Sequence, residues 1–439
     1  MRRRRVPGSL PGMFVKQHLP GSIGNRVLIQ PTGLSWDLPF YVFEGGHTPD
    51  GDGPRTSVDW ATLRPSGTKT RYVDVNTGND GNTGVDWDNA WKGIDYALSQ
   101  ANADADLVTI YVKAGTYVST NRWNNQNVDH DLCVLASGGT VIVGDTSSVF
   151  PAFAVDPLNP PAYKGARTSV QNVTDLGQIR PEGDGTVMVP AANAAAVAAT
   201  PGSWYTDGVD LWLRLYDDSA PTVDRIWISL SVSGPFMDSA GSTLYVGPET
   251  ESDAWEFRMQ FRCDNYAMII FENCAFKYTR LGNGIMALNV NTAYTRNCRC
   301  AQDNLDGFNY HDTVNILEES VTSWRNGLYK GTNSNNGSSS HENARTVRVR
   351  GEHAYSYGPQ IVDIENTEAW CVGVTARDSL APGGGIDAAG FRTANNMWLR
   401  DCIAGPNNVD DLVETGAGAL TVTTTEYTTT SGTIVEEAP

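Results

Sequence analysis

The sequence predicts an all-β fold in which the chain winds into many stacked coils, and three observations lead to this prediction. The chain has 439 residues, more than one compact core usually organises, whereas a fold that grows by adding layers has no such limit. Its 44 glycines and 22 prolines indicate frequent turns, and only 19% of its residues are charged. A strand-like segment followed by a polar or glycine turn also recurs along the second half of the chain.

The recurring segment defines a column of turn positions. It is found at MIIFENCAF (268–276), AYTRNCRCA (293–301), NILEESVTS (315–323), VRVRGEHAY (347–355), AWCVGVTAR (369–377) and MWLRDCIAG (397–405). The predicted turn residues, 22 to 32 positions apart, are Asn273, Asn297, Glu319, Gly351, Gly373 and Asp401. The next position is predicted to form a buried ladder of small residues, Cys274, Cys298, Ser320 and Cys402. Spacings of this length are typical of one coil of a parallel β-helix, so the sequence predicts main coils over 263–410.

A second strand is expected after each turn, in NGIMALNV, DGFNYH, NGLYKG, YGPQIVDI and GGGIDAAG. Superposing their glycines places one column inward, made of Ile285, Phe308, Leu328, Pro359 and Ile386. The adjacent column is expected to face outward and contains Met286, Asn309, Tyr329, Gln360 and Asp387. Within DGFNYH the period of two sends Phe308 and Tyr310 to one face and Asn309 and His311 to the other.

The segment that precedes the repeats reads as the start of the coil. From Arg71 the sequence gives a strand, a Gly/Asn-rich turn, a helix and a second strand. Trp91, Ile94, Leu98 and Ala101 follow helical spacing and form one apolar side. The run from Tyr72 to Tyr117 resembles the N-terminal start of right-handed parallel β-helix proteins of the pectate-lyase-like superfamily, in which such a helix caps the first coil. This resemblance implies the fold and leaves the chemistry open.

Five regions are expected along the chain. Residues 1–69 form an extended N-terminal arm, and 70–148 hold the capping helix and the first coils. Residues 149–262 include PGSWYTDGVDLWLRLYDDSAPTVDRIWIS and are expected to form a small inserted antiparallel β module, before the main coils at 263–410. Residues 411–439 alternate β-branched and polar residues, which predicts terminal strands that cover the last coil or pair with a neighbouring chain.

Composition excludes several classes of function. A formal net charge of −18 disfavours binding to nucleic acid, although the MRRRR start forms a short basic tail. The sequence has no run of 18 apolar residues, so we expect no membrane insertion, and prolines and glycines after the arginines argue against a secretory signal. The seven cysteines lack a CxxC pair, which argues against disulfides and a zinc site. The Asn/Asp-rich segment 73–86 lacks the order of a calcium-binding loop, so we expect no metal and no cofactor.

The candidate catalytic site lies where polar residues gather on neighbouring coils. It comprises His311 and Asp312, then Tyr329 and Lys330, and His341 in the insertion GTNSNNGSSSHENAR. Cleavage of an acidic polysaccharide by β-elimination needs a base, an acid and a cation that neutralises the uronate. His311 or His341, Tyr329, and Lys330 or Arg325 could supply these groups. Hydrolysis would instead use a pair of carboxylates, and stacked coils offer many such pairs.

Binding residues are expected around the same surface. The candidates are Asn309, Tyr310, Glu342, Tyr355, Tyr357, Gln360 and Asp387. Each also has a structural interpretation, since asparagine and histidine on a β-helix are often solvated wall residues and aspartate beside a turn often caps backbone N–H groups.

DGFNYH and NGSSSH also resemble segments of β-helix proteins from bacteriophage particles and from polysaccharide-degrading bacteria. The resemblance implies a phage tailspike or head spike, a homotrimer that binds host surface polysaccharide, contacts other virion proteins through its N-terminal arm, and as a further hypothesis depolymerises the glycan. A virion component released by lysis needs no export signal. Two alternatives remain: a non-enzymatic structural or adhesin subunit of a virion, and a bacterial polysaccharide lyase.

Overall fold

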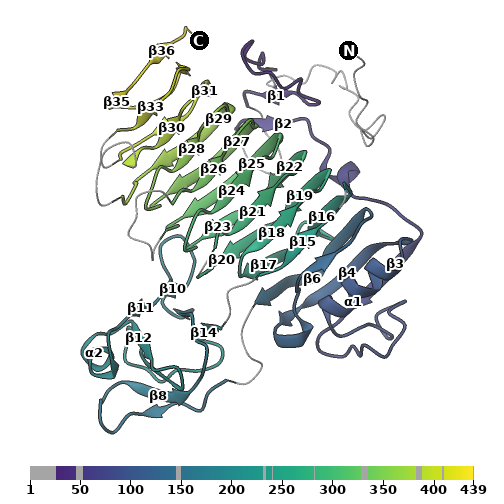
Figure 1. Ribbon diagram of the computed structural model, residues 1–439, viewed down its shortest axis with the longest axis vertical. Helices are drawn as coiled ribbons and strands as arrows, with labels where there is room; N and C mark the ends of the chain where they lie inside the picture. The colour runs from purple at the N-terminus through teal and green to yellow at the C-terminus, as the bar shows by residue number, and fades with distance from the viewer. Residues whose placement is uncertain are drawn as a thin grey trace.

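The computed structural model describes residues 26–45, 53–144, 150–230, 234–239, 241–280, 282–327, 335–381, 388–407 and 410–438. Over these residues the chain folds as a parallel β-helix, in which strands from successive coils pair in parallel along two long sheets (Figure 1). The predicted all-β fold class is therefore confirmed. Among the described residues no helix is long and apolar enough to cross a membrane.

The first sheet contains one strand from each coil, and every pairing along it is parallel. Within the described residues its strands are β5 (Gln126–Asn127), β15 (Phe236–Asp238), β18 (Phe261–Asp264), β21 (Ile285–Leu288), β24 (Phe308–His311), β26 (Ser338–Ser340), β28 (Ile361–Asp363), β30 (Phe391–Thr393), β33 (Leu412–Glu414) and β35 (Thr430–Ser431). The strands follow each other in sequence order, so each coil covers the one before it.

The second sheet makes up the rest of each coil. Its strands are β3 (Lys69–Val73), β4 (Leu107–Tyr117), β6 (Leu132–Gly144), β16 (Thr243–Pro248), β17 (Ala254–Arg258), β19 (Met268–Glu272), β20 (Cys274–Lys277), β22 (Thr292–Arg296), β23 (Arg299–Ala301), β25 (Asn315–Trp324), β27 (Arg345–Ala354), β29 (Glu368–Arg377), β31 (Met397–Arg400), β32 (Ile403–Ala404), β34 (Leu420–Thr423) and β36 (Ile434–Glu436). β33 to β36 thus continue the stack to the end of the described chain, as further coils.

This sheet bends at one left-handed residue per coil. The bend residues are Asn273, Asn297, Ser320, Arg350, Gly373, Asp401 and Thr424. The turn column is thus confirmed at four positions, but Glu319 and Gly351 were each placed one residue off the bend. Ser320 stacks on Arg350, whose Nε donates to the Ser320 hydroxyl over 2.7 Å. Gly351 is required for another reason: a Cβ there would lie 2.3 Å from the Val321 carbonyl oxygen.

The ladder of small residues lies just after the bend. Cys274, Cys298 and Cys402 are buried in it as predicted. Ser320 is not part of this ladder because it occupies the bend, and Val321 takes the buried position in its coil.

The inward column of the first sheet matches the prediction only in its first two coils. Ile285 pairs with Phe308, and the next partners are Ser338, Ile361 and Phe391. Pro359 lies in the loop before β28, while Leu328 and Ile386 fall outside the described residues. The prediction failed here because the serines of β26 carry no hydrophobic signal and were counted as a loop.

Serines fit this wall because the coil interior is ionic at that level. Arg348 is buried between Glu318 and Asp363, with nitrogen–oxygen distances of 2.9 and 2.7 Å. The Ser338 hydroxyl donates to Glu318 over 2.8 Å and accepts from Arg348. Nearer the N-terminal end the interior is aromatic, with Trp255, Phe257 and Phe276 stacked 5.3 to 5.4 Å apart.

A helix covers the first coil, as predicted. Helix α1 (Ile94–Ala103) buries Ile94, Ala97, Leu98 and Ala101 beside β4 and follows the bridge between Val73 and Trp91 (Figure 1). The short 3-10 helix η2 (Ser119–Asn121) lies beside it. The start of the coil is therefore closed by an apolar helix side rather than left as an open sheet edge.

The inserted module projects from one side of the coil (Figure 1). It comprises β7 (Ala154–Val155), β8 (Tyr163–Ala166), β9 (Asn172–Asp175), β10 (Thr186–Val187), β11 (Val189–Pro190), α2 (Ala194–Ala199), β12 (Ser203–Thr206), β13 (Asp210–Arg214) and β14 (Ile226–Ser229). Most of its pairings are antiparallel, and it has a small core of its own. The module ends earlier than the expected residue 262, because β15 to β18 already pair in parallel with the coil.

The described part of the N-terminal arm packs on the outside of its own second sheet. It contains β1 (Val42–Phe43), β2 (Arg55–Thr56) and the 3-10 helix η1 (Trp60–Leu63). Apolar arm residues cover outward-facing side chains of the sheet, including Tyr294, Leu317 and Trp370. Glu319 fixes the arm by accepting hydrogen bonds from the Thr56 backbone, the Thr56 hydroxyl and the Trp60 indole. Residues 1–25, including the arginine run, fall outside the described residues.

Candidate functional site

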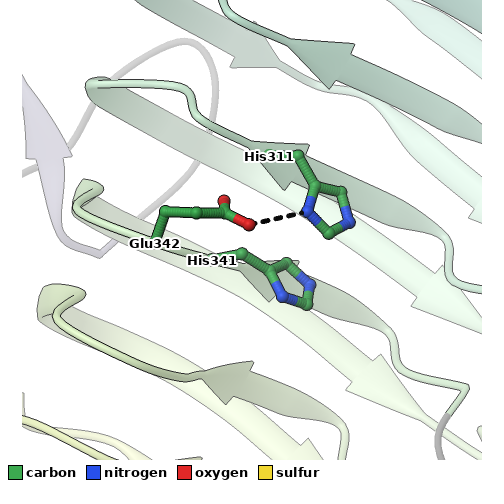
Figure 2. Close-up of side chains that lie close together, drawn as sticks. All are labelled: His311, His341 and Glu342. Atoms are coloured by element: carbon green, nitrogen blue, oxygen red, sulfur yellow. Dashed lines mark hydrogen bonds and ion pairs between the residues drawn. The ribbon is translucent and has the colours of Figure 1, made fainter.

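Two histidines and a glutamate meet where the first sheet turns into the second. His311 ends β24, and His341 directly follows β26, the strand that pairs with it. Their rings are stacked, with centroids 4.0 Å apart and planes at 18°, and His311 Nδ1 lies 3.1 Å from Glu342 Oε1 (Figure 2). The register therefore brings together two histidines separated by 30 positions, as the sequence predicted. We call His311, Asp312, His341 and Glu342 the histidine corner.

The corner is shaped by a second column of left-handed residues. These are Asn265, Asn289, Asp312, Glu342 and Glu365, with φ between 49° and 63°. Acidic side chains in this column bind the backbone of the preceding coil: Glu342 Oε2 accepts from the Asp312 N–H over 2.7 Å, and Glu365 Oε2 accepts from the Glu342 N–H over 2.9 Å. The two carboxylate oxygens of Glu342 thus hold the turn and the imidazole at once.

The imidazoles of the corner differ in environment. His311 has 30% of its side chain exposed, whereas burial, and then the neighbouring His311, lower the pKa of His341 to about 4. His341 is therefore neutral at pH 7, and its Nε2 is buried with no hydrogen-bond partner among the described residues. The ligand atoms of His311, His341 and Glu342 all lie within 4.8 Å of one another, so the cluster can share a proton, a substrate hydroxyl or a cation.

Three residues predicted to bind substrate have structural roles instead. Tyr310 points into the coil and is fully buried, in agreement with the period-two pattern. Asn309 is 6% exposed, and its amide donates to Asp306 over 2.6 Å. Gln360, expected on the outer face, is buried and bonds the backbone of Ser356 and Gly358. The prediction failed because the glycine alignment did not follow the true register of β28, which starts only at Ile361.

The remaining predicted residues fall into three sets. Asp312 is exposed at the histidine corner. Tyr329, Lys330 and Asp387 fall outside the described residues, so their assignments stay predictions. Tyr355 and Tyr357 are half-buried, but they follow β27 and lie beyond the far end of that strand from the histidine corner.

Tyr355 belongs to a second cluster, at the ends of β25, β27 and β29. Its ring lies 6.3 Å from that of Trp324 at an interplanar angle of 25°. The guanidinium carbons of Arg325 and Arg377 lie 4.7 and 5.3 Å from the Tyr355 ring, and Arg377 donates to its hydroxyl over 3.0 Å. We call Trp324, Arg325, Glu352, Tyr355 and Arg377 the aromatic face.

Sequence reasoning missed Trp324, Glu352 and Arg377. The available signal was the alternation of inward and outward residues at the end of each repeat. On the observed pairing this alternation places Trp324, Ala354 and Arg377 directly beside one another on adjacent strands. Tyr355, at φ 62°, leaves the strand direction directly after the buried Ala354.

Every arginine of the aromatic face has a carboxylate partner. Arg377 Nε donates to Glu352 over 2.7 Å and also pairs with Asp378. Arg325 pairs with Glu182 of the inserted module at 3.1 Å. The same module is docked on the neighbouring coils by the Tyr278 hydroxyl and by Gln302, which bonds the backbone of Gly185. The aromatic face therefore borders the inserted module.

No protein-family model and no curated protein matches the chain. Among solved structures, it is similar to the xylose complex of XylC (10% identity, 81% of this chain and 67% of that chain, TM-score 0.37) and to pectate lyase Pel9A (13%, 86% and 80%, TM-score 0.35). A further match is the Gp54 tailspike of Acinetobacter baumannii bacteriophage AP22 in complex with capsular saccharide (14%, 79% and 66%, TM-score 0.26). At these TM-scores the fold assignment stands on the strand pairing of the chain itself.

Proposed function

We propose that the protein is a virion spike that binds host surface polysaccharide through its aromatic face. The observation that carries the proposal is the partly exposed Trp324 beside the Arg325–Tyr355–Arg377 stack, on adjacent coils. An aromatic ring offers an apolar surface to a sugar ring, and neighbouring coils lie about 4.8 Å apart, so the face presents a row of side chains to a linear polymer. The proposal includes assembly as a homotrimer and contact with other virion proteins through the N-terminal arm.

The charge balance of the aromatic face points to the class of glycan. The whole chain has a net charge of −18, which repels polyanions at long range. On the aromatic face each guanidinium is already paired with a carboxylate. Such pairs offer donors and acceptors to sugar hydroxyls, so neutral polysaccharides fit better than polyuronates.

Replacing the exposed tryptophan tests the proposal. Trp324→Ala is expected to weaken binding to the recognised polysaccharide about tenfold or more, or about 1.4 kcal/mol, because it removes the ring that stacks on sugar. Binding is measured by biolayer interferometry on a panel of purified bacterial surface polysaccharides.

Trp87→Ala is the matched control. Trp87 is also partly exposed and also contacts a tyrosine and a cation, Tyr72 and Lys113, but it lies in the segment before the capping helix. Equal affinity of wild type and Trp324→Ala would reject the aromatic face as the binding surface. No binding to any polysaccharide of the panel would favour a structural subunit of the particle instead.

A second candidate function is cleavage of the bound glycan at the histidine corner. The contact of His311 Nδ1 with Glu342 favours it, because a carboxylate that orients one nitrogen leaves the other free for substrate. His311→Ala is then expected to abolish product formation, with its circular dichroism unchanged. Reducing ends and unsaturated uronates are measured separately, since only elimination creates the latter. A normal product yield from His311→Ala would remove the catalytic assignment.

A further inference from the structure

The histidine corner carries an inference that goes beyond glycan binding. Two imidazoles and one carboxylate come from two adjacent coils and have their ligand atoms within 4.8 Å of one another. This donor set suits zinc and its first-row neighbours, whereas calcium and magnesium prefer oxygen ligands. We propose that His311, His341 and Glu342 bind one divalent transition-metal ion, for which Zn²⁺ is the probe.

The backbone already places the three donors for an ion. The His341 N–H donates to the Tyr310 carbonyl over 3.1 Å, and the parallel pairing of β24 with β26 fixes the two Cα atoms. Glu342 Oε1 lies 3.1 Å from His311 Nδ1, close to the separation of about 3.3 Å between two ligands of a tetrahedral ion with bonds of about 2.0 Å. Only side-chain torsions have to change for binding.

The required side-chain change is small and specific. The two rings lie one above the other and nearly parallel, as Figure 2 shows, so one ion cannot lie in both ring planes. Their centroids are 4.0 Å apart. Rotation of one imidazole about its Cβ–Cγ bond brings a nitrogen toward the Glu342 carboxylate. Metal binding therefore breaks the stack of the two rings.

The surroundings of the corner support an open rather than a closed site. Glu342 Oε2 accepts from the Asp312 N–H, which orients the carboxylate while Oε1 faces the imidazole. His311 and Glu342 retain 30% and 27% exposure of their side chains. Three protein ligands leave at least one position for water or a sugar hydroxyl. Elsewhere in the described chain His130 contacts the Leu107 carbonyl and His353 faces the coil interior, so neither joins a comparable group.

Metal binding is tested on the full chain by equilibrium dialysis with Zn²⁺ and by the visible absorption of bound Co²⁺. Wild type is expected to bind one ion more than His341→Ala, with an intense Co²⁺ spectrum that this variant lacks. Glu342→Gln, which keeps the shape of the side chain, is expected to bind about tenfold more weakly or worse. His130→Ala is the control for binding to surface histidines and should match wild type.

Equal stoichiometry and affinity of wild type and His341→Ala would overturn the proposal, and so would an equal loss in His130→Ala. Thermal unfolding guards against misfolding: at the same concentration, Zn²⁺ should raise the melting temperature of wild type more than that of Glu342→Gln, which binds the ion more weakly. The proposal is independent of the aromatic face. Chelation should leave glycan binding intact, and Trp324→Ala should bind Zn²⁺ like wild type, so failure of one proposal is distinguishable from failure of the other.

Discussion

The histidine corner and the aromatic face lie at the two ends of strand β25. The strand begins just after His311 and Asp312 and ends at Trp324. The corner is formed by side chains that contact each other, with stacked imidazoles and a carboxylate that also holds the backbone. The aromatic face presents alternating rings and guanidinium groups outward, beside the inserted module. Neighbouring coils thus support a compact cluster suited to a small ion at one end of their strands and a broad surface suited to a polymer at the other end.

The comparison of the histidine corner with the aromatic face shows how sites form in this fold. Residues that stack on adjacent coils form a site more often than residues that are close in sequence. His353 and Tyr355 are two positions apart, yet His353 is buried with its Nδ1 at 2.8 Å from the Ser323 hydroxyl, while Tyr355 lies at the surface. His311 and His341 are 30 positions apart and stack. The polar interior around Arg348 lies within β27, the strand that runs from the histidine corner to the aromatic face.

The largest expected effect comes from Arg348, because its buried ion pairs with Glu318 and Asp363 join neighbouring coils. Arg348→Met leaves the buried carboxyl groups of Glu318 and Asp363 without their cation, which should cost about 3–5 kcal/mol of unfolding free energy. Urea denaturation followed by circular dichroism measures the loss. Arg377→Met, at a partly exposed ion pair, serves as control and should cost less than about 1 kcal/mol. A loss below about 1 kcal/mol in Arg348→Met would show that the interior network does not hold the coils.

A smaller loss of folding stability is expected when the pH is lowered. Burial, and then Arg348, lower the pKa of His353 from its ordinary 6.5 to about 3. The unfolded chain therefore binds a proton that the folded chain excludes, so this residue lowers stability progressively as the pH falls from about 6.5 to about 3.

Comparing wild type with His353→Gln isolates the contribution of His353 to the pH dependence of stability. The variant is less stable at pH 7, but its urea midpoint should fall less between pH 7 and pH 4. Parallel loss in both proteins would show that His353 does not titrate with unfolding.

The smallest expected effect is that of a substitution in the histidine corner on glycan binding at the aromatic face. Glu342→Gln should leave glycan affinity within about twofold of wild type, since the aromatic face does not contact the corner through any bond in the described chain. Affinity measured by biolayer interferometry with and without Zn²⁺ gives the coupling. A change of tenfold would mean that the corner and the aromatic face form one site.

The sequence predicted the architecture because its signals repeat. Asn273, Asn297, Gly373 and Asp401 all occupy the bend, since asparagine, glycine and aspartate accept positive φ readily. Arg350 was missed because the bend is set by stacking on Ser320, whatever side chain is present. The serines of β26 were missed because a wall that faces a buried ion pair has no hydrophobic period.

The candidate site was predictable in part. The proximity of His311 and His341 followed from the register of one strand pair. The predicted column of outward-facing residues does not follow the observed pairing after Asn309. The alignment on glycines lost the register there, because the length of the coil changed. Trp324 and Arg377 emerge only when three coils are superposed on the observed pairing.

The most direct test of the aromatic face as the binding surface is a crystal structure of the protein with an oligosaccharide from the polysaccharide it binds. A sugar ring is expected against Trp324, with its hydroxyls bonded to Arg325, Arg377 or Glu352. Sugar density located elsewhere on the protein, with Trp324 uncovered, would contradict it.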